Sequence, residues 1–336
     1  LDGGSITVSS SSGIGTGTFR IGAGAASSGT LFFNNTSADT LSNNIELPAP
    51  GAATTYEILK ASSGSGTGTL LDLTGVLSGG NANSTLRLNS NVSGDNTTTF
   101  RLGANNTIAG TIDLNRGTLI VTGNNSLGTA TLWLNGNGNS TLGDLRFESP
   151  VTLANNIVLV GSPNPSPIHT GGHTVTLSGT LSSGSSQLIK IGAGTLVLTG
   201  SNTYSTATAV NNGVLQIGNG GTTGNLGPGS AVTIAASGQL VIDRNNAYSA
   251  SNTIANSGNV TVNSSGTTTL SGAISGAGTL SQSGSGTTVL SASNTYTGAT
   301  TVNQGTLELN YAAANTSKLS DSSALNLNGG TVNSVG

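Results

Sequence analysis

Two short segments hold the residues whose types and spacing could support chemistry. In the segment DLRFE, three charged residues, Asp144, Arg146 and Glu148, alternate with two apolar ones. Because successive side chains of a strand point to opposite faces, these three charges would share one face. Two carboxylates on one face could act as acid and base in glycoside cleavage. An arginine between two acids is more typical of a solvated, ion-paired surface, so we predict no catalytic residue here.

The second segment, HTGGH, contains both histidines, His169 and His173. Four residues apart on a helix they could share a metal ion. The preceding SPNPSP disfavours a helix, however, because proline lacks the backbone N–H that a helix needs. Two histidines without a nearby Cys or Asp are a weak metal signal, and the calcium-binding repeat Gly-Gly-x-Gly-x-Asp is absent. We predict an exposed, protruding loop, no metal site and no cofactor.

Tyr204 and Tyr296 occupy the same place in two similar phrases, SNTYSTATAVNNGVLQI and SNTYTGATTVNQGTLEL. A tyrosine could stack on a sugar ring, but equivalent placement in successive repeats favours packing against the edge of each repeat. The triplets Asn91–Ser93 and Asn96–Thr98 match the N-glycosylation pattern. In a chain so rich in Asn, Ser and Thr, such triplets are expected by chance.

The composition of the chain narrows the class of protein. Only 6% of the 336 residues are charged, against about a quarter in ordinary domains. The nine Lys and Arg residues are scattered singly, so nucleic acid is not an expected partner. The absence of Cys fits a bacterial surface protein better than a large secreted animal protein. No apolar run is long enough to span a membrane, so we expect any export signal or anchor to lie outside these residues.

Short apolar alternations separated by turn residues predict an all-β fold. GTLVLTG and GQLVIDR each place apolar residues at i and i+2, which is the period of a strand. Gly, Asn or Ser follows each alternation. Because Gly costs roughly 0.5–1 kcal/mol inside a strand or helix, most of the 52 glycines are expected at turns. No segment shows a sustained helical period.

The predicted strands recur along the chain as an internal repeat. Residues 191–218 and 283–310 match without gaps at 15 of 28 positions, at an offset of 92, and 105–123 is a weaker third copy. Three turn glycines fall in register: Gly117, Gly213 and Gly305. The repeat divides the chain into approximate units, of which the last is incomplete: 1–98, 99–190, 191–282 and 283–336.

A unit of this length corresponds to about four coils of roughly 23 residues, within the range of solenoid repeats. We therefore predict a right-handed parallel β-helix (β-solenoid) of about 14–15 coils, forming one elongated domain over 1–336. The competing folds are a β-propeller, whose blades usually carry aromatic signatures, and an array of β-sandwiches. The chain has a single Trp, Trp133, and no Cys-Trp-Cys pattern, so we favour the β-helix.

The β-helix assigns a place to each common residue type. Inward residues stack on like residues of neighbouring coils, so we expect Leu198 and Leu290 to point inward at equivalent positions. Asn and Gly tolerate a left-handed backbone at coil corners, and LSNNI and LANNI are the expected corners. Stacked Asn side chains can also bond to one another in ladders.

At residues 192–215 the sequence GAGTLVLTGSNTYSTATAVNNGVL resembles the autotransporter-associated β-strand repeat, also called the passenger-associated transport repeat. The resemblance is specific over Lys190–Gly218 and Gln282–Asn310 and diffuse elsewhere. The second copy has Thr288 and Ser291 where the pattern has Leu and Thr. The resemblance implies a parallel β-helix in a passenger region exported across a bacterial outer membrane. The C-terminal membrane barrel of that family is not in this sequence.

We therefore predict a non-enzymatic structural or adhesive β-helix at the outer surface of a bacterium or outside the cell, acting as a stalk, an adhesin or a fibre subunit. Both ends of the chain, LDGGSITV and LNLNGGTVNSVG, are written in the ordinary repeat pattern. The expected partners are neighbouring coils of a longer chain or end-to-end copies, and host or surface carbohydrate or protein. The alternative is a carbohydrate-active lyase or hydrolase, which a carboxylate cluster formed by distant coils would favour.

Overall fold

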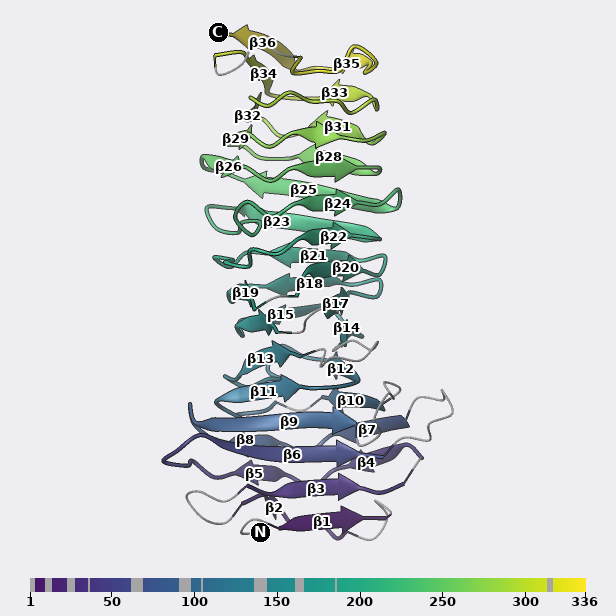
Figure 1. Ribbon diagram of the computed structural model, residues 1–336, viewed down its shortest axis with the longest axis vertical. Helices are drawn as coiled ribbons and strands as arrows, with labels where there is room; N and C mark the ends of the chain where they lie inside the picture. Colours follow the sequence, from purple (N-terminus) through teal and green to yellow (C-terminus); the bar gives the residue numbers. More distant parts are fainter. Residues whose placement is uncertain are drawn as a thin grey trace. The chain divides into compact units, whose positions relative to one another are not determined.

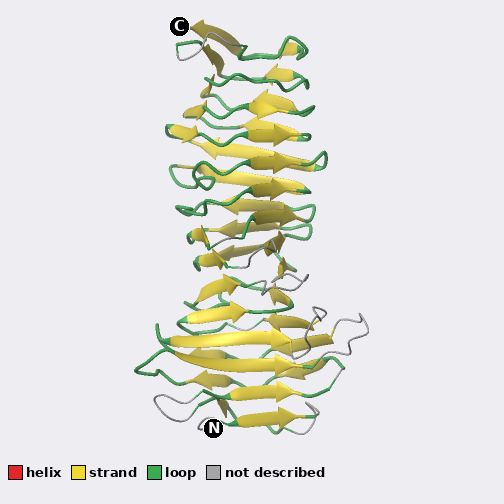
Figure 2. Ribbon diagram, viewed as in Figure 1, coloured by secondary structure: helices red, strands yellow, loops and turns green. Residues whose placement is uncertain are grey.

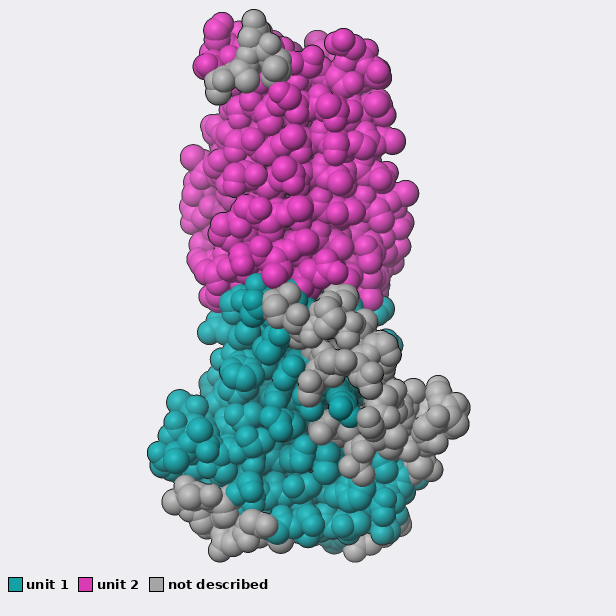
Figure 3. All heavy atoms as spheres, viewed as in Figure 1, with its two compact units in different colours: residues 1–169, 182–186 teal, residues 170–181, 187–336 magenta. Residues whose placement is uncertain are grey.

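The computed structural model describes residues 4–9, 14–22, 28–35, 37–61, 69–90, 98–103, 105–135, 144–160, 166–184, 186–312 and 317–336. Over these ranges the chain consists of short strands joined by turns (Figure 2). They contain no helix long and apolar enough to cross a membrane. The chain forms two compact units, the first comprising residues 1–169 and 182–186 and the second residues 170–181 and 187–336 (Figure 3).

In the first unit, parallel strands form three ladders (Figure 1). The first ladder contains β1 (Ser5–Val8), β3 (Thr30–Phe33), β6 (Thr54–Lys60), β9 (Ser84–Ser90), β11 (Thr111–Leu114), β13 (Thr131–Leu134) and β16 (Ile157–Leu159). The second contains β4 (Asp39–Leu41), β7 (Thr69–Leu73), β10 (Thr98–Leu102), β12 (Thr118–Val121), β14 (Asp144–Phe147) and β17 (Ser166–His169). The third contains β2 (Phe19–Arg20), β5 (Ile45–Leu47) and β8 (Leu77–Gly79). Of the two remaining strands, β15 (Val151–Leu153) belongs to the first unit, and β19 (Leu181–Ser183) has residues in both units.

The second unit repeats this organisation in three ladders (Figure 1). The first contains β18 (Thr174–Leu177), β21 (Thr195–Leu198), β23 (Gly213–Gly221), β25 (Gly238–Arg244), β28 (Asn259–Val262), β31 (Thr279–Gln282), β33 (Thr300–Val302) and β35 (Leu325–Leu327). The second contains β20 (Leu188–Ile191), β22 (Thr208–Val210), β24 (Val232–Ile234), β27 (Ile254–Asn256) and β30 (Ile274–Ser275). The third contains β26 (Tyr248–Ala250), β29 (Thr267–Leu270), β32 (Thr287–Leu290), β34 (Thr306–Asn310) and β36 (Thr331–Val335).

The predicted β-solenoid is thus confirmed, and the strand register gives the length of its coils. Thr195 lies opposite Thr174 of the preceding coil and Val214 of the next, so these two coils take 21 and 19 residues. In the first unit Asp39 lies opposite Leu71, and that coil takes 32 residues. Over the described ranges the structure has about 12 turns, fewer than the expected 14 or 15, because several coils of the first unit use more chain.

Leucine, isoleucine and valine fill the interior in columns that run from coil to coil. Leu198 and Leu290 are both fully buried, as predicted, but their positions in the coil are not equivalent, because β21 and β32 belong to different ladders. In the second unit one column consists of Leu198, Ile217, Ile242 and Val262, each opposite the next in the parallel register. Because each residue is covered by its neighbours above and below, burial of these side chains depends on the adjacent coils. At about 25 cal/mol per Å² of apolar surface, this burial is the main stabilising term.

The three turn glycines adopt the left-handed backbone that the repeat predicts. Gly117, Gly213 and Gly305 have φ values of 96°, 69° and 60°. A Cβ built on Gly213 would overlap the carbonyl oxygen of Gly192, and one on Gly305 would overlap that of Gly286. These positions therefore need glycine for two reasons, the sign of φ and the close approach of the neighbouring coil.

The role predicted for the corner asparagines was wrong. Within the described ranges no residue other than glycine has a positive φ, so Asn43 and Asn155 are not left-handed corners. Both side chains are buried. The amide of Asn43 donates to the carbonyls of Gly15 and Gly17 at 3.1 and 2.7 Å, and Asn155 makes two such bonds at 3.0 and 2.8 Å. These amides satisfy backbone oxygens of the preceding coil instead of forming a ladder.

Lys190, the first residue of the specific repeat match, is fully buried. Its Nζ donates to the carbonyls of Ile191, Gly192 and Asn212 at 3.1, 2.7 and 3.0 Å. Burial lowers the pKa of this amine to about 8, because desolvation penalises the charged form. The three carbonyls accept its protons but supply no formal charge to offset that penalty.

We expect the stability of the second unit to rise between pH 8 and about 9.5. The unfolded amine has a pKa of about 10.4 and keeps its proton in this window, whereas the folded amine loses it. The unfolded state then binds more protons, so the free energy of unfolding increases with pH, by about 1–2 kcal/mol between pH 8 and 9.5. Urea unfolding at several pH values checks this, and Lys190→Met should flatten the slope. An equal slope in that variant would contradict the assignment.

Candidate functional site

Asp144 and Arg146 share one face of β14, as predicted, while Leu145 and Phe147 are buried on the other, and Glu148 follows the end of the strand. The predicted solvated, ion-paired face holds for Arg146 and Glu148, whereas Asp144 is ion-paired but only 7% exposed. Its Oδ2 accepts from Nε and Nη2 of Arg146, both at 2.7 Å. Glu148 does not pair with Arg146. Its Oε2 lies 2.9 Å from Nη2 of Arg101.

Distant coils complete a network of charges around this strand. Nη1 of Arg101 also lies 3.2 Å from Oδ2 of Asp72, so that one guanidinium joins two acids from different coils. The parallel register places Asp72 opposite Arg101 on β7 and β10, and Arg146 opposite His169 on β14 and β17. Asp72 and Arg101 were not predicted from the sequence as part of this network. The sequence could have indicated this pair, because TLLDL and TTFRL have the same strand pattern and each has a charged residue at its fourth position.

Asp144 has the most perturbed environment in this network. Burial raises the pKa of its carboxyl above the usual range, while the positive charges of Arg146 and His169 act in the opposite direction. Its Oδ1 is buried and has no hydrogen-bond partner within the described chain. Oδ2 lies 3.8 Å from Nε2 of His169. A carboxyl with a raised pKa can donate a proton, but glycoside cleavage needs a second carboxyl that is available to substrate, and both Glu148 and Asp72 are bound to Arg101.

The two histidines do not lie in a protruding loop. His169 ends β17, and the backbone N–H of His173 donates to the carbonyl of Thr170 at 2.9 Å, so the segment is a tight turn between β17 and β18. The side chain of His169 is 32% exposed. Over the residues that the structure describes, no three His, Cys, Asp or Glu side chains are grouped closely enough to hold a metal ion.

Tyr204 and Tyr296 are fully buried, which supports packing and leaves no ring face for a sugar. Thr208 Oγ1 donates to the hydroxyl of Tyr204 at 3.1 Å, and Thr300 makes the same contact with Tyr296 at 2.6 Å. The two repeats thus bury the same tyrosine–threonine pair. The triplet at 91–93 and the first two residues of the triplet at 96–98 lie outside the described residues.

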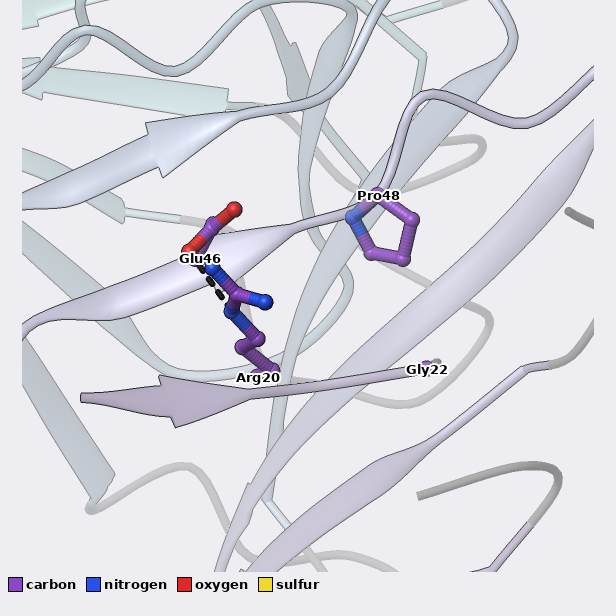
Figure 4. Close-up of a pocket in the computed structure, with 4 residues that line it drawn as sticks. All are labelled: Arg20, Gly22, Glu46 and Pro48. Atoms are coloured by element: carbon purple, nitrogen blue, oxygen red, sulfur yellow. Dashed lines mark hydrogen bonds and ion pairs between the residues drawn. The ribbon is translucent and has the colours of Figure 1, made fainter. Parts of the chain in front are cut away.

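Two hollows on the surface of the first unit were not predicted. One, of about 160 Å³, is lined by Arg20, Gly22, Glu46 and Pro48 (Figure 4). Nε of Arg20 donates to Oε2 of Glu46 at 2.9 Å, and both side chains are well exposed. This pair is therefore solvated and weak.

The other hollow, of about 310 Å³, offers only amides, hydroxyls and small side chains. It is lined by Asn124, Asn125, Gly128, Thr129, Thr131, Thr152, Ala154, Asn155 and Asn156. Such a lining can hydrogen-bond a hydroxyl-rich ligand, but it contains no group that titrates near neutral pH and so cannot act as acid or base.

Comparison with known proteins agrees with the repeats seen in the sequence. Residues 92–121, 188–217 and 280–309 match a family model described as Passenger-associated-transport-repeat. A segment of 79 residues, 23% of the chain, is 43% identical to "Adhesin BmaC autotransporter" of Brucella suis biovar 1 (strain 1330) and covers 2% of that protein's length. No solved structure matches the chain. Together with the stacked parallel strands, these matches identify the chain as a β-solenoid built with passenger-associated transport repeats.

Proposed function

We propose that this chain is a non-enzymatic part of a surface-exposed or secreted autotransporter-type passenger, in which stacked coils act as a stiff support. The observation that carries this proposal is the parallel pairing of successive coils within each unit, with one shift of register in β23 between Ile217 and Gly221. Inward side chains pack on those of the adjacent coils, so load on one coil passes directly to its neighbours. The charged side chains near β14 are bound to one another, which gives little support to the alternative of a polysaccharide lyase or hydrolase.

An adhesive role is the second candidate. It is supported by the name of the matched relative, an adhesin, and by the polar hollow lined by Asn124 to Asn156. Amides and hydroxyls in a shallow surface suit weak binding of carbohydrate or of a polar protein surface. In this role the coils would both carry the hollow and hold it away from the cell.

The exposed leucines of the strand β35 are evidence that another coil stacks on it. Leu325 and Leu327 continue the inward column of β33, opposite Thr300 and Val302, which are fully buried. The two leucines are instead 43% and 57% exposed. An uncovered strand with an apolar inner face invites pairing with another strand. We propose that another coil of the same kind, from a longer chain or a second copy, covers it.

We expect purified 1–336 to associate with increasing concentration in analytical ultracentrifugation. Leu327→Glu should weaken this association by at least about tenfold, because it places a charge on the stacking surface. The matched control is Asn326→Glu, which adds the same charge on the opposite face of β35 and should have little effect. A chain that stays monomeric at high concentration, or equal effects of the two variants, would contradict stacking at this edge.

A further inference from the structure

Three polar side chains of the first unit converge on one point. Lys60 ends β6, Asp39 begins β4, and Asn35 lies two residues beyond β3. Lys60 is fully buried and Asp39 is 5% exposed. The Nζ of Lys60 lies 2.6 Å from Oδ2 of Asp39 and 2.6 Å from Oδ1 of Asn35, and it also donates to the backbone carbonyl of Asn35 at 2.9 Å. The amine thus directly contacts a buried carboxyl and the half-buried side chain of Asn35.

The other two buried lysines have a different environment. The Nζ of Lys190 donates to three backbone carbonyls. The Nζ of Lys318 donates to the carbonyl of Ser291 and lies 5.5 Å from the ring centre of Tyr311. Among the buried lysines of the described chain, Lys60 is therefore the one whose contacts include both a carboxylate and a side-chain amide.

We propose that Lys60 and Asn35 form an intramolecular isopeptide bond, with Asp39 as the group that moves the protons. Lys60 first passes a proton to Asp39 across their short hydrogen bond. The free amine then attacks Cγ of Asn35, which is one C=O bond away from the oxygen it already contacts. Nζ–Cγ forms and Cγ–Nδ2 breaks. Of the two protons that the lysine ammonium gives up, one converts the leaving NH₂ to ammonia and the other stays on Asp39.

The surroundings of Asn35 suit this reaction. The backbone N–H and the hydroxyl of Ser37 both donate to Oδ1 of Asn35 at 3.3 Å. Negative charge develops on this oxygen when the amine adds, and donors already aimed at it stabilise the adduct. The Nδ2 group donates to the carbonyl of Ser9 at 3.3 Å, which holds the amide in place. Strand pairing fixes the amine, because Phe33 of β3 lies directly opposite Lys60.

The bond would join two adjacent coils covalently. β3 and β6 belong to successive coils, and the cross-link would close the loop between residues 35 and 60. A closed loop restricts the unfolded chain and stabilises the folded one, as a disulfide does. The sequence has no Cys, so a disulfide cannot serve this purpose. The proposed bond therefore adds a redox-independent clamp to a fold whose coils are otherwise held by hydrogen bonds and apolar packing.

Intact-mass spectrometry of purified 1–336 tests the proposal. The expected mass is lower than that calculated from the sequence by one ammonia, about 17 Da. Trypsin should fail to cut after Lys60, and cleavage after Glu46 should leave the two flanking pieces joined through Asn35 and Lys60. A measured mass equal to the calculated one, together with normal cleavage after Lys60, would overturn the proposal. Lys60 and Asp39 would then form only a buried ion pair. A deficit of about 17 Da without a cross-link would indicate a succinimide, and a deficit of about 18 Da with Lys60 joined to Asp39 would assign the wrong partner; both also overturn it.

Variants separate the roles of the three residues. Asn35→Ala and Lys60→Met should each restore the full calculated mass. Asp39→Asn should do the same, or slow cross-linking by at least about a hundredfold, since it removes the proton carrier. Lys190→Met is the matched control and should keep the deficit. Circular dichroism establishes that each variant is folded, and an Asp39→Asn protein that is folded and cross-links at the normal rate would refute the role of Asp39.

Discussion

Leu198→Ala is expected to lower the free energy of unfolding of the second unit by about 2–5 kcal/mol. The side chain is fully buried and stacks on Ile217 of the next coil. Its removal leaves a cavity that the stacked coils cannot close, because hydrogen bonds hold the strands at fixed spacing. Leu290→Ala should have a similar effect, since Leu290 occupies the equivalent place in the second repeat and stacks on Leu309.

The damage from Leu198→Ala should remain local. In a solenoid each coil interacts with its neighbours only, so protection from hydrogen exchange should fall in β18, β21 and β23 and remain in β34 and β36. Val241→Ala is the matched control, because Val241 is a half-buried, outward residue of the same ladder and should cost less than about 1 kcal/mol. Loss of protection over the whole second unit would show that the coils unfold as one cooperative block.

The sequence was sufficient to predict the fold because the repeat encodes it directly. Turn glycines at offsets of 96 and 92 residues and apolar pairs at i and i+2 specify parallel coils. The burial of Leu198, Leu290, Tyr204 and Tyr296 follows from their equivalent places in the repeat. The number of coils was harder to predict, because the pattern is diffuse in the first unit. There the register requires up to 32 residues per coil, as between Asp39 and Leu71, and nothing in the composition marks this change.

Contacts between side chains of different coils could not be predicted in this way. In a solenoid, residues about 20–30 positions apart become neighbours, so acids that are isolated in the sequence can still meet. Asp72 meets Arg101, and Lys60 meets Asn35 and Asp39, for this reason. Glu148 reaches Arg101 from two coils further along the chain. The exact coil length decides which residues face each other, and an error of one residue reverses the face.

The corner asparagines show a second limit. Asn is compatible with a left-handed backbone and also with a buried side chain that bonds to backbone carbonyls. Sequence alone does not distinguish these roles. The structure assigns Asn43 the second role, because its amide reaches two carbonyls of the preceding coil, while the left-handed positions are taken by glycines such as Gly117.

Gly305→Ala should be among the most damaging single substitutions in the turns. Gly305 has φ +60°, where an alanine costs roughly 1–2 kcal/mol. A Cβ at this position would also overlap the carbonyl oxygen of Gly286 in the preceding coil. That oxygen belongs to the backbone and accepts the N–H of Thr306 at 3.0 Å, so relief of the overlap would disturb the strand pairing of β32 and β34. A further 1–3 kcal/mol is expected from this overpacking.

Gly229→Ala separates the two contributions. Gly229 has a similar φ of +67°, but a Cβ there would meet nothing within 4 Å. Its substitution should therefore cost only the backbone term of roughly 1–2 kcal/mol, whereas Gly305→Ala should cost clearly more. Urea unfolding, with hydrogen exchange in β32, β34 and β36, measures both. Equal costs for the two variants would show that the close approach of the coils at Gly305 contributes nothing, and that the repeat keeps glycine there for its backbone conformation alone.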